Sequence, residues 1–394
     1  MNTKLTKLFI EFYESKKTSG IILIFCTVAS IVLANSCVGK GYVDFWQTKV
    51  GFEISDTIFL KYSLAFWIND GLMAVFFLLI GIEIERELYV GELSNLKDAS
   101  LPLIAAIGGM VTPAMIHFLL NRGTGTSAGA AIPMATDIAF ALGVLALLGN
   151  RVPASIKIFL AALAIIDDMG AILVIAMFYI RDFSMLYLVS ALGIFAGLLI
   201  LNRLGVNRLP FYLIPGFIMW YFMLKSGVHS TIAGVLLAFA IPFRLGDEES
   251  PSYKVQHFLH KPVALIIIPL FALANTDIVP TGNWIEGSAT LNSLGIIAGL
   301  FVGKPLGIVL FSFLAVKAGI SQLPSDVLWK HIVGIGFLGG IGFTMSIFIT
   351  ILAFGNPEIV QSSKISILLG SLLAGTVGFL LLNKQTISIS NHPA

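Results

Sequence analysis

Two adjacent aspartates inside an apolar run are the residues of this sequence best suited to chemistry. The run is "ALAIIDDMGAILVIAMFYI", residues 162–180, and the pair is Asp167 and Asp168. Neighbours on a helix point about 100° apart, so one carboxylate can face a cavity while the other meets an adjacent helix. Like-charge repulsion and poor solvation favour binding of a proton, and carboxylate oxygens also suit a hard cation. The pair can therefore bind a proton and a cation in exchange. The alternative is a structural pair whose charges are neutralised by other residues.

A third aspartate lies in a segment whose sequence interrupts a helix. In "IPMATDIAFALG", residues 132–143, Thr136 and Asp137 follow Pro133 and precede Gly143. Proline removes a backbone donor and disfavours helix for the residue before it. A helix break at membrane depth frees carbonyls and amides, which can hold an ion where they line a cavity. The structural alternative is an aspartate that caps a restarting helix, although Ser or Thr would do this without a charge.

A lysine occurs deep in another apolar run. Lys304 lies in "GIIAGLFVGKPLGIVLFSF", at a depth in its span similar to that of the aspartate pair, and Pro305 after it favours a kink. From this depth a lysine cannot easily extend its amine to the surface. Charges inside a membrane usually pair across a helix interface, and the aspartate pair is the natural partner.

A glycine cluster forms a fourth feature. The string "VGIGFLGGIGFTMSIFIT", residues 333–350, places five glycines before Thr344. Such clusters often mean only close helix packing. Together with the interrupted "ATDIAF" segment, however, this string favours a second broken helix. Two interrupted segments in corresponding halves indicate an inverted repeat with a site near the middle of the bilayer.

The composition shows which class of protein must position these residues. Of the 394 residues, 57% are hydrophobic and only 12% are charged, and the mean hydropathy is +0.93. Soluble domains carry about 25% charged residues, so we expect one polytopic membrane domain over residues 1–394. The net charge of +2 and the lack of a Lys/Arg block argue against a nucleic-acid partner. The two cysteines lack a metal-binding spacing, and we expect no cofactor.

The predicted fold class is an all-α membrane protein with about twelve transmembrane helices. A helix needs about 20 apolar residues to cross a bilayer, and the period-2 alternation of barrel strands is absent. We interpret Ile21–Ala34 as a retained first span rather than a cleaved leader. The approximate span centres are residues 28, 76, 110, 140, 167, 193, 217, 234, 268, 302, 342 and 372.

Charge bias orients this arrangement. With loops assigned alternately, 16 of the 24 Lys and Arg residues fall on the side that holds both termini and seven on the other, with Lys304 inside a span. The positive-inside rule then makes both termini cytoplasmic. In the outer loop, residues 38–62, "FWQTKVGFEIS" allows a small β-hairpin or an irregular loop. The inner loop, residues 243–261, is charged and expected to be solvated.

At these motifs the chain resembles the NhaA-type sodium/proton antiporter family. The matching strings run in family order from about residue 64 to 350: "WINDGLMAVFFLLIGIEIERE", "ATDIAFALGVLALLG", "RVPASIKIFLAALAIIDDMGAI", "LKSGVHSTIAG", "GLFVGKPLGI" and "GIGFTMSIFI". The aspartate-pair string together with "ATDIAFALG" is highly specific. The resemblance implies spans three to five and ten to twelve as an inverted repeat, with broken spans 4 and 11 crossing each other.

The resemblance also implies residue roles. Asp167 and Asp168 would carry the ion and the protons, with Asp168 the main sodium carboxylate and Asp167 the switchable partner of Lys304. Thr136 and Asp137 would lie at the helix crossing, with Thr136 beside the sodium. The implied activity is electrogenic exchange of two inward protons per outward sodium, with lithium as a second cation. It is activated at alkaline pH, serves sodium and pH homeostasis, and belongs to a homodimer in the bacterial inner membrane.

The family's pH-sensing region would lie at the cytoplasmic mouth. The matching positions are Glu83, Arg86 and Glu87 after the second span, His257 and His260 in the inner loop, and His229 after "KSGV". Histidines change charge near neutral pH, so the carboxylates fit an alkaline switch better. Without the resemblance, the charges at residues 83–87 would indicate only a solvated helix end. Gln256 departs from the family, which often has glutamate there, and this affects the expected pH threshold rather than transport.

Three other classes fit the residues less well. A proton-coupled symporter would need a larger polar solute site than these clusters provide. A cation channel would favour repeated filter loops or rings of charge. An intramembrane aspartyl protease, the enzyme alternative, would place its aspartates on separate helices in Tyr-Asp and Gly-x-Gly-Asp settings, and neither occurs here. We therefore expect a secondary transporter rather than an enzyme.

Overall fold

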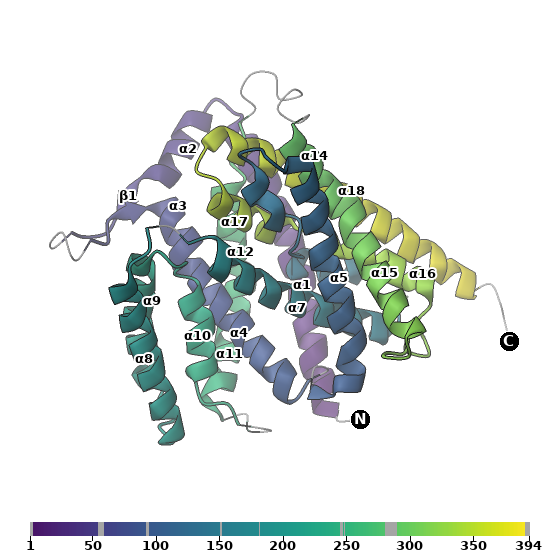
Figure 1. Ribbon diagram of the computed structural model, residues 1–394, viewed down its shortest axis with the longest axis horizontal. Helices are drawn as coiled ribbons and strands as arrows, with labels where there is room; N and C mark the ends of the chain where they lie inside the picture. The colour runs from purple at the N-terminus through teal and green to yellow at the C-terminus, as the bar shows by residue number, and fades with distance from the viewer. Residues whose placement is uncertain are drawn as a thin grey trace. The chain divides into compact units, whose positions relative to one another are not determined.

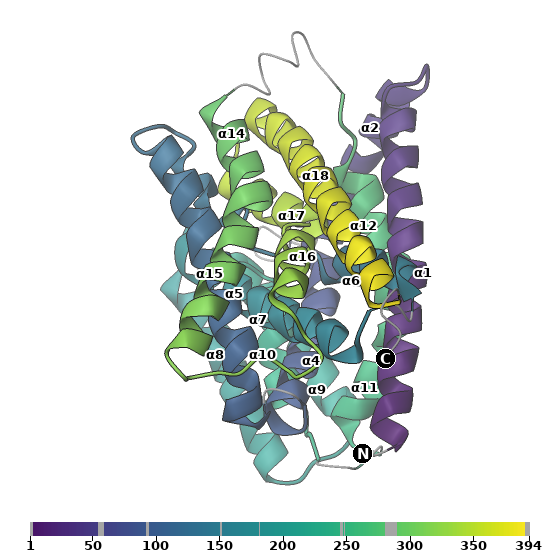
Figure 2. The same ribbon diagram turned by 90° about the vertical axis from the view of Figure 1, so that its right-hand side faces the viewer.

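The computed structural model describes residues 3–53, 59–91, 94–149, 152–180, 182–244, 247, 249–279 and 290–390. The described residues are mostly helical (Figures 1 and 2). It forms two compact units. The first unit contains Met1–Leu23, Val90–Ala171 and Pro280–Ala394, and the second contains Ile24–Tyr89 and Ile172–Val279. Two long helices, α1 (Thr3–Ala34) and α7 (Ala154–Phe178), pass from one unit to the other.

The remaining elements belong to one unit each. Those of the first unit are α5 (Leu96–Asn121), η3 (Ser127–Ala131), α6 (Ile138–Leu147), α14 (Leu291–Ala298), η6 (Gly299–Gly303), α15 (Lys304–Lys317), α16 (Trp329–Gly339), α17 (Phe343–Ala353) and α18 (Pro357–Ser390). Those of the second unit are α2 (Gly39–Gln47), β1 (Lys49–Val50), β2 (Tyr62–Ser63), α3 (Leu64–Phe66), η1 (Trp67–Leu72), α4 (Met73–Tyr89), α8 (Met185–Arg203), α9 (Pro210–Ser226), α10 (Ile232–Ala240), α11 (Pro251–Pro262), η5 (Val263–Ile267) and α12 (Ile268–Asn275).

The described residues include seven helices that are long and apolar enough to cross a membrane, or nine if each of two bent helix pairs is one span. The predicted class, a helical membrane protein, is therefore confirmed. Eleven of the twelve predicted span centres fall within helices, and residue 342 falls at the break between α16 and α17. The centres at 140 and 234 lie in α6 and α10, which are shorter than a bilayer needs, and the centre at 217 lies in α9, whose 17 residues are at the lower limit. The count of twelve and the inverted repeat stay predictions.

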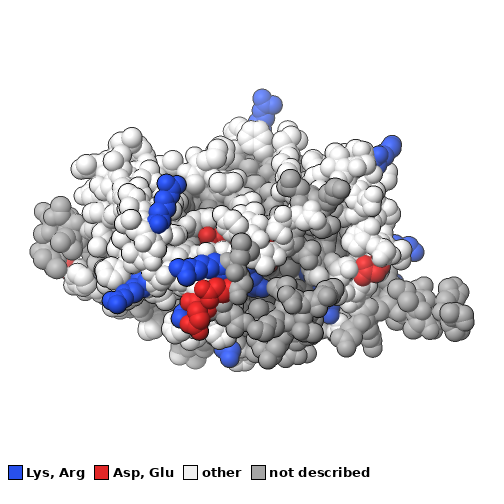
Figure 3. All heavy atoms as spheres, turned by 90° about the horizontal axis from the view of Figure 1, so that it is seen from below, with Lys and Arg blue, Asp and Glu red and all other residues white. Residues whose placement is uncertain are grey.

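The surface has the character that lipid requires. Uncharged residues make up most of the described surface in the view of Figure 3, and charged side chains are sparse there. Large apolar side chains are well exposed, among them Phe25 at 71%, Phe178 at 72% and Leu186 at 74%. Soluble monomers rarely expose so much apolar area, whereas hydrocarbon solvates it.

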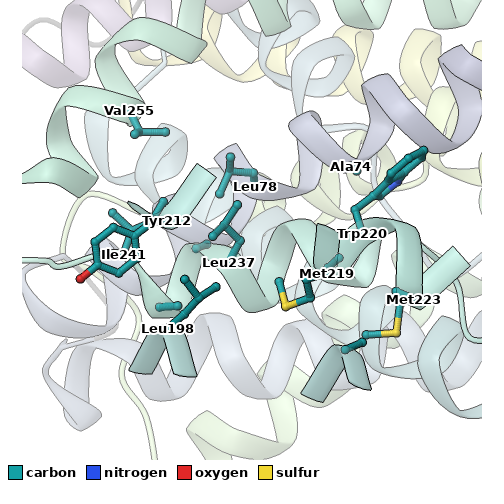
Figure 4. Close-up of a cluster of buried hydrophobic side chains, with 14 of the residues drawn as sticks. Ala74, Leu78, Leu198, Tyr212, Met219, Trp220, Met223, Leu237, Ile241 and Val255 are labelled. Carbon is teal, nitrogen blue, oxygen red and sulfur yellow. The ribbon is translucent and has the colours of Figure 1, made fainter. Parts of the chain in front are cut away.

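The core of the second unit lies among α4, α8, α9 and α10. Met219, Trp220 and Met223 on α9 are buried together with Leu237 on α10 and Leu78 on α4 (Figure 4). Large apolar and sulfur-containing side chains fill this space, and the flexible methionines suit an irregular interface.

Two loops expected from the sequence contain regular structure. In the outer loop, residues 38–62, the first three residues of the hairpin candidate "FWQTKVGFEIS" belong to helix α2. They are helical because they continue the amphipathic pattern of α2. The antiparallel ladder pairs Lys49 with Ser63 and Val50 with Tyr62. In the inner stretch 243–261, Pro251 begins helix α11, and the Ser250 hydroxyl caps it by accepting from the Tyr253 N–H. A serine N-cap followed by proline is a helix-start signal that outweighs the charged composition.

In the first unit, α5 and α15 lie side by side (Figures 1 and 2). They approach through Gly108 and Gly307, where a Cβ on Gly307 would come within 2.0 Å of the Gly108 carbonyl oxygen. Lys304 lies one helical turn before Gly307, so this glycine contact fixes the lysine's backbone against α5.

This contact predicts a large effect of Gly307→Ala. The added methyl must push the two helices apart, at a cost of about 1–3 kcal/mol as in other overpacked interiors. We expect a lower unfolding temperature of the detergent-purified protein, measured by tryptophan fluorescence. The matched control is Gly193→Ala on α8, where a Cβ would meet nothing within 4 Å and the melt should be unchanged. Equal melting of wild type and Gly307→Ala would show that the helices do not meet through this glycine.

Candidate functional site

Two broken segments of the first unit are hydrogen-bonded to each other at their breaks. One consists of η3, an extended stretch through Thr136, and α6; the other consists of α16 and α17, which bend by 45° at residues 340–342. The Asp137 N–H donates to the Ile341 carbonyl at 2.7 Å, and the Ser346 hydroxyl donates to the Ile132 carbonyl at 2.6 Å. Backbone groups freed by each break therefore find partners in the other segment, as a poorly hydrated site requires.

Glycine is needed at the second break because other atoms of the protein lie too close for a side chain. A Cβ on Gly340 would lie 2.3 Å from the Leu300 carbonyl oxygen. A Cβ on Gly342 would lie 2.2 Å from the Ser346 hydroxyl and 3.2 Å from the Ala135 carbonyl oxygen. The glycine cluster thus lets the bend of α16 and α17 reach the break before α6.

Asp137 lies at the start of two helices. Its Oδ1 accepts from the Phe140 N–H at 2.9 Å and so caps α6, while its Oδ2 accepts from the N–H of Thr344 at 3.1 Å in the first turn of α17. The Thr344 hydroxyl donates to the same oxygen at 2.5 Å. The carboxylate is only 2% exposed. Since helix N-termini carry partial positive charge, one buried aspartate here is balanced by two helix ends.

Asp167 and Lys304 form a fully buried ion pair. The Lys304 Nζ lies 2.6 Å from the Asp167 Oδ2, and both side chains have 0% exposure. Lys304 also donates to the Met134 carbonyl, which the first break leaves free. The Thr136 hydroxyl lies 2.7 Å from the same Asp167 oxygen and 2.8 Å from the Gly339 carbonyl oxygen at the end of α16. The ammonium and hydroxyl therefore join α7 to carbonyls of both broken segments.

Asp168 is also fully buried, and it adds a third carboxylate to this region. Its charge interacts electrostatically with Lys304. Lys304 can balance only one of the two adjacent carboxylates, and the helix ends compensate Asp137. A fully deprotonated cluster would thus hold more negative charge than a dry interior tolerates. One more positive charge, a proton or a small cation, would correct this.

The structure places the predicted site residues in three regions, one in the first unit and two in the second. Thr136, Asp137, Asp167, Asp168 and Lys304 lie on neighbouring segments of the first unit. No cluster of three or more His, Cys, Asp or Glu side chains arranged for a resident metal ion occurs in the described parts of the chain. The ion-site residues instead offer mixed carboxylate, hydroxyl and carbonyl oxygens.

The residues proposed for pH sensing lie in the second unit, in two places. Glu83, Arg86 and Glu87 are on α4, which packs against α11 with His257 and His260. Glu83 is 5% exposed, so this helix end is not simply solvated. His229 lies elsewhere. Its Nδ1 is 3.9 Å from a carboxylate oxygen of Asp70, which is in η1, the segment that continues directly into α4. From Asp70 to Glu83 is about 20 Å along a helix axis, so His229 does not belong to the other group.

Sequence reasoning missed some residues that complete the site. Thr344 was noticed only as the end of the glycine cluster, yet it binds Asp137. The Ser371 hydroxyl on α18 accepts from the N–H groups of Gly342 and Phe343, both at 3.2 Å, and caps α17. Glu85, next to the proposed regulatory residues, is only 7% exposed. Polar residues between apolar neighbours were the available signal, but many such serines exist in the chain.

A family model and individual relatives give the same answer when the chain is compared with known proteins. The model of the family described as "Na+/H+ antiporter 1" matches residues 10–382. A Na+/H+ antiporter NhaA of Dechloromonas aromatica is 60% identical over 386 residues, covering 97% of both chains. The relative from Flavobacterium psychrophilum is 58% identical over 376 residues, 95% of this chain and 96% of its own. One from Escherichia coli is 48% identical over 373 residues, 94% and 96% of the respective chains.

The buried pair predicts a stability cycle. Lys304→Met leaves Asp167 buried beside no ammonium, and breaking such a pair costs about 3–5 kcal/mol. Adding Asp167→Asn to this variant removes the isolated charge and should restore much of the loss. The measurement is the unfolding temperature of Lys304→Met, Asp167→Asn, the double variant and the wild type in the same detergent. If Lys304→Met alone melts like wild type, or if the second substitution restores nothing, the two side chains are not energetically coupled.

Proposed function

The chain belongs to the family of NhaA-type Na+/H+ antiporters, and we propose that it exchanges sodium for protons across a bacterial inner membrane. It is a secondary transporter that expels sodium, and also lithium, against entering protons. The observation that carries this proposal is the buried Asp167–Lys304 pair beside Asp168, at the contact of two broken helical segments. Binding at helix breaks near the bilayer midplane is a common design of such transporters.

Asp168 is the main sodium carboxylate in this proposal. Its neighbour Asp167 is held by Lys304 and Thr136 through a single oxygen, Oδ2, whereas Oδ1 makes no hydrogen bond to the described residues. Oδ1 can therefore coordinate a cation without loss of the backbone contacts of the site. The Thr136 hydroxyl adds a neutral oxygen of the kind that small hard cations accept as a ligand.

The proposed cycle follows from charge balance. With the site open inward and its carboxylates deprotonated, sodium supplies the missing positive charge. The occupied site reorients, releases sodium outside and takes up protons, which then supply that charge for the return. Rigid-body movement of the bundle that carries the broken helices is the expected motion. An empty, fully deprotonated site would return slowly because it would move an unbalanced charge through the protein.

A stoichiometry of two protons per sodium makes the cycle electrogenic. One net positive charge moving inward gains about 2.3 kcal/mol per 100 mV of membrane potential. A tenfold concentration ratio corresponds to about 1.36 kcal/mol, so this potential supports a sodium gradient of about 50-fold without any pH gradient. Such an exchanger can expel sodium at alkaline pH, where the proton gradient is small or inverted.

The regulatory part of the proposal concerns the second unit. Alkaline activation is assigned to the α4 carboxylates Glu83 and Glu87 with Arg86, and to His257 and His260 on the adjacent α11. His229 contributes separately, through Asp70. We further propose cytoplasmic termini and a homodimer. The charge bias of the loops supports the former, and the β1–β2 ladder offers an exposed edge for the latter.

The direct test is sodium-induced proton movement in everted membrane vesicles. Vesicles acidified by respiration should lose their pH gradient when sodium or lithium is added at pH 8. Asp168→Asn should reduce this signal by at least about 100-fold, because the remaining carboxylate is engaged by Lys304. The matched control is Ser190→Ala, which removes an exposed hydroxyl on α8 that, among the described residues, bonds to its own helix.

The two failures have separate meanings. A wild type without any sodium- or lithium-dependent signal would contradict the antiport activity itself. Normal exchange by Asp168→Asn would leave antiport intact but contradict the assignment of the carrier residue.

A further inference from the structure

The connection between α15 and α16 joins three helices of the ion site at the end of the first unit that faces the cytoplasm in the proposed orientation. The Ser155 hydroxyl in the first turn of α7 donates to the Asp326 Oδ2 in this connection at 2.9 Å. Trp329, the first residue of α16, packs edge-on against Phe313 of α15, with ring centroids 5.6 Å apart. The helices joined here carry the aspartate pair, the site lysine and the Gly339 carbonyl.

A buried histidine caps α16 at this end. The Leu328 N–H donates to the His331 Nδ1 at 3.1 Å, and the His331 N–H donates to the Leu328 carbonyl at 2.8 Å. His331 is only 4% exposed. It occupies the third position after the N-cap, from which a glutamate or glutamine side chain closes a capping box. Neither the ion site nor the regulatory residues of the second unit include this side chain.

The cap of α16 exists only while the imidazole is neutral. The Nδ1 lone pair accepts the hydrogen bond from Leu328, so Nδ1 cannot take up a proton until that N–H is released. Histidine takes up such a proton near neutral pH. The Asp326 carboxylate acts electrostatically on His331 and would attract the imidazolium. Protonation therefore removes the cap and draws Asp326 away from Ser155.

The other charged groups at this end of the helices are lysines. Lys330 lies on α16 itself and Lys157 in the first turn of α7, while Lys317 ends α15 and Lys384 lies on α18 two residues beyond the Leu382 contact with α16. The third helix packed against α16, α6, carries no titratable side chain. The lysines oppose a second positive charge, although water and salt screen the three that are exposed, on α15, α16 and α18. The protonated state of the histidine therefore depends on Asp326.

Helix α16 connects this cap to the ion site. Its last residue, Gly339, accepts a hydrogen bond of 2.8 Å from the Thr136 hydroxyl. His331 and Gly339 are eight residues apart, which is about 12 Å along the helix axis. Between them the helix packs tightly, since a Cβ on Gly336 would lie 3.0 Å from the Cα of Pro305, which follows the site lysine. A change in the first turn of α16 is therefore passed on to the carbonyl and the lysine of the site.

We propose that His331 is a proton-operated brake on exchange. Neutral His331 caps α16 and supports the transporting arrangement of the site, whereas protonated His331 pairs with Asp326, releases the cap and slows exchange. This inference rests on the proposed antiport function. It differs from the alkaline activation assigned to the second unit, because His331 belongs to the first unit. An exchanger that brings protons inward benefits from such a brake when the cytoplasm is already acidic.

His331→Gln tests the brake, because glutamine at this position can still accept from the Leu328 N–H but cannot take up a proton. The measurement is sodium/proton exchange by the purified protein in liposomes, at saturating sodium, at pH 8 and at pH 6. Wild type and variant should exchange at similar rates at pH 8. Between pH 8 and pH 6 the rate of the wild type should fall about fivefold more than that of the variant, the effect of one lost helix cap.

Three further variants separate the cap from its surroundings. Asp326→Asn keeps an acceptor for Ser155 but removes the charge that attracts the imidazolium, so it should reduce the extra loss at pH 6. His331→Ala removes the cap at every pH and should be about fivefold slower than wild type at pH 8. The matched control is Lys317→Gln, which removes an exposed charge from the end of α15 and should keep the pH dependence of the wild type.

A second measurement does not depend on transport. Because the cap excludes the proton, its contribution to stability is present at pH 8 and is lost as the pH falls. The melting temperature of the wild type should therefore fall more between pH 8 and pH 6 than that of His331→Gln. An equal fall in melting temperature, or an equal loss of exchange, would overturn the brake. A wild type with the larger fall but no sodium-dependent exchange at pH 8 would contradict the antiport function and still support the proton-sensitive cap.

Discussion

The structure of the first unit depends on how it neutralises charge in a place without water. Three carboxylates and one ammonium are buried together, and each ionised group needs compensation close at hand. Asp137 obtains it from the N-terminal ends of α6 and α17, and Asp167 obtains it from Lys304. Lys304 in turn satisfies a carbonyl that the first break sets free. Breaking two helices thus creates the partial charges that the ionised side chains need, and neither feature would be stable alone.

Small residues make this arrangement sterically possible. Gly340 and Gly342 bring the second break against its neighbours, and Gly108 and Gly307 bring α5 against α15 at the level of Lys304. Ser371 caps the restarted helix with a neutral hydroxyl, so no further charge is added to the site. The charged side chains can then exchange counter-ions while the backbone framework stays satisfied.

Much of this could be predicted from the sequence, because charges in apolar runs are costly and few. The pairing of Lys304 with the aspartate pair followed from depth and sign, whereas the choice of Asp167 within that pair came from the family resemblance. The break at Asp137 followed from Pro133 and a polar pair. Thr344 and Ser371 could not be identified in this way, since hydroxyl residues are common in membrane helices and only the folded chain shows which ones meet a buried carboxylate or a free N–H. The location of His229 apart from the α4 carboxylates was also hidden, because sequence motifs carry no distances. Helix α11 was missed where charged composition hid the Ser-Pro start signal.

The central claim is that a proton and a sodium ion alternate as the positive charge that this buried cluster requires. The measurement that tests it most directly is the number of protons released when sodium binds to the purified protein. A pH indicator in weakly buffered detergent solution would report it, with choline chloride as the ionic control. The account predicts proton release on sodium addition. It also predicts that, where the site is protonated, the sodium dissociation constant rises by up to about tenfold per unit of acidification for each proton released. Sodium binding that releases no protons and does not depend on pH would contradict it.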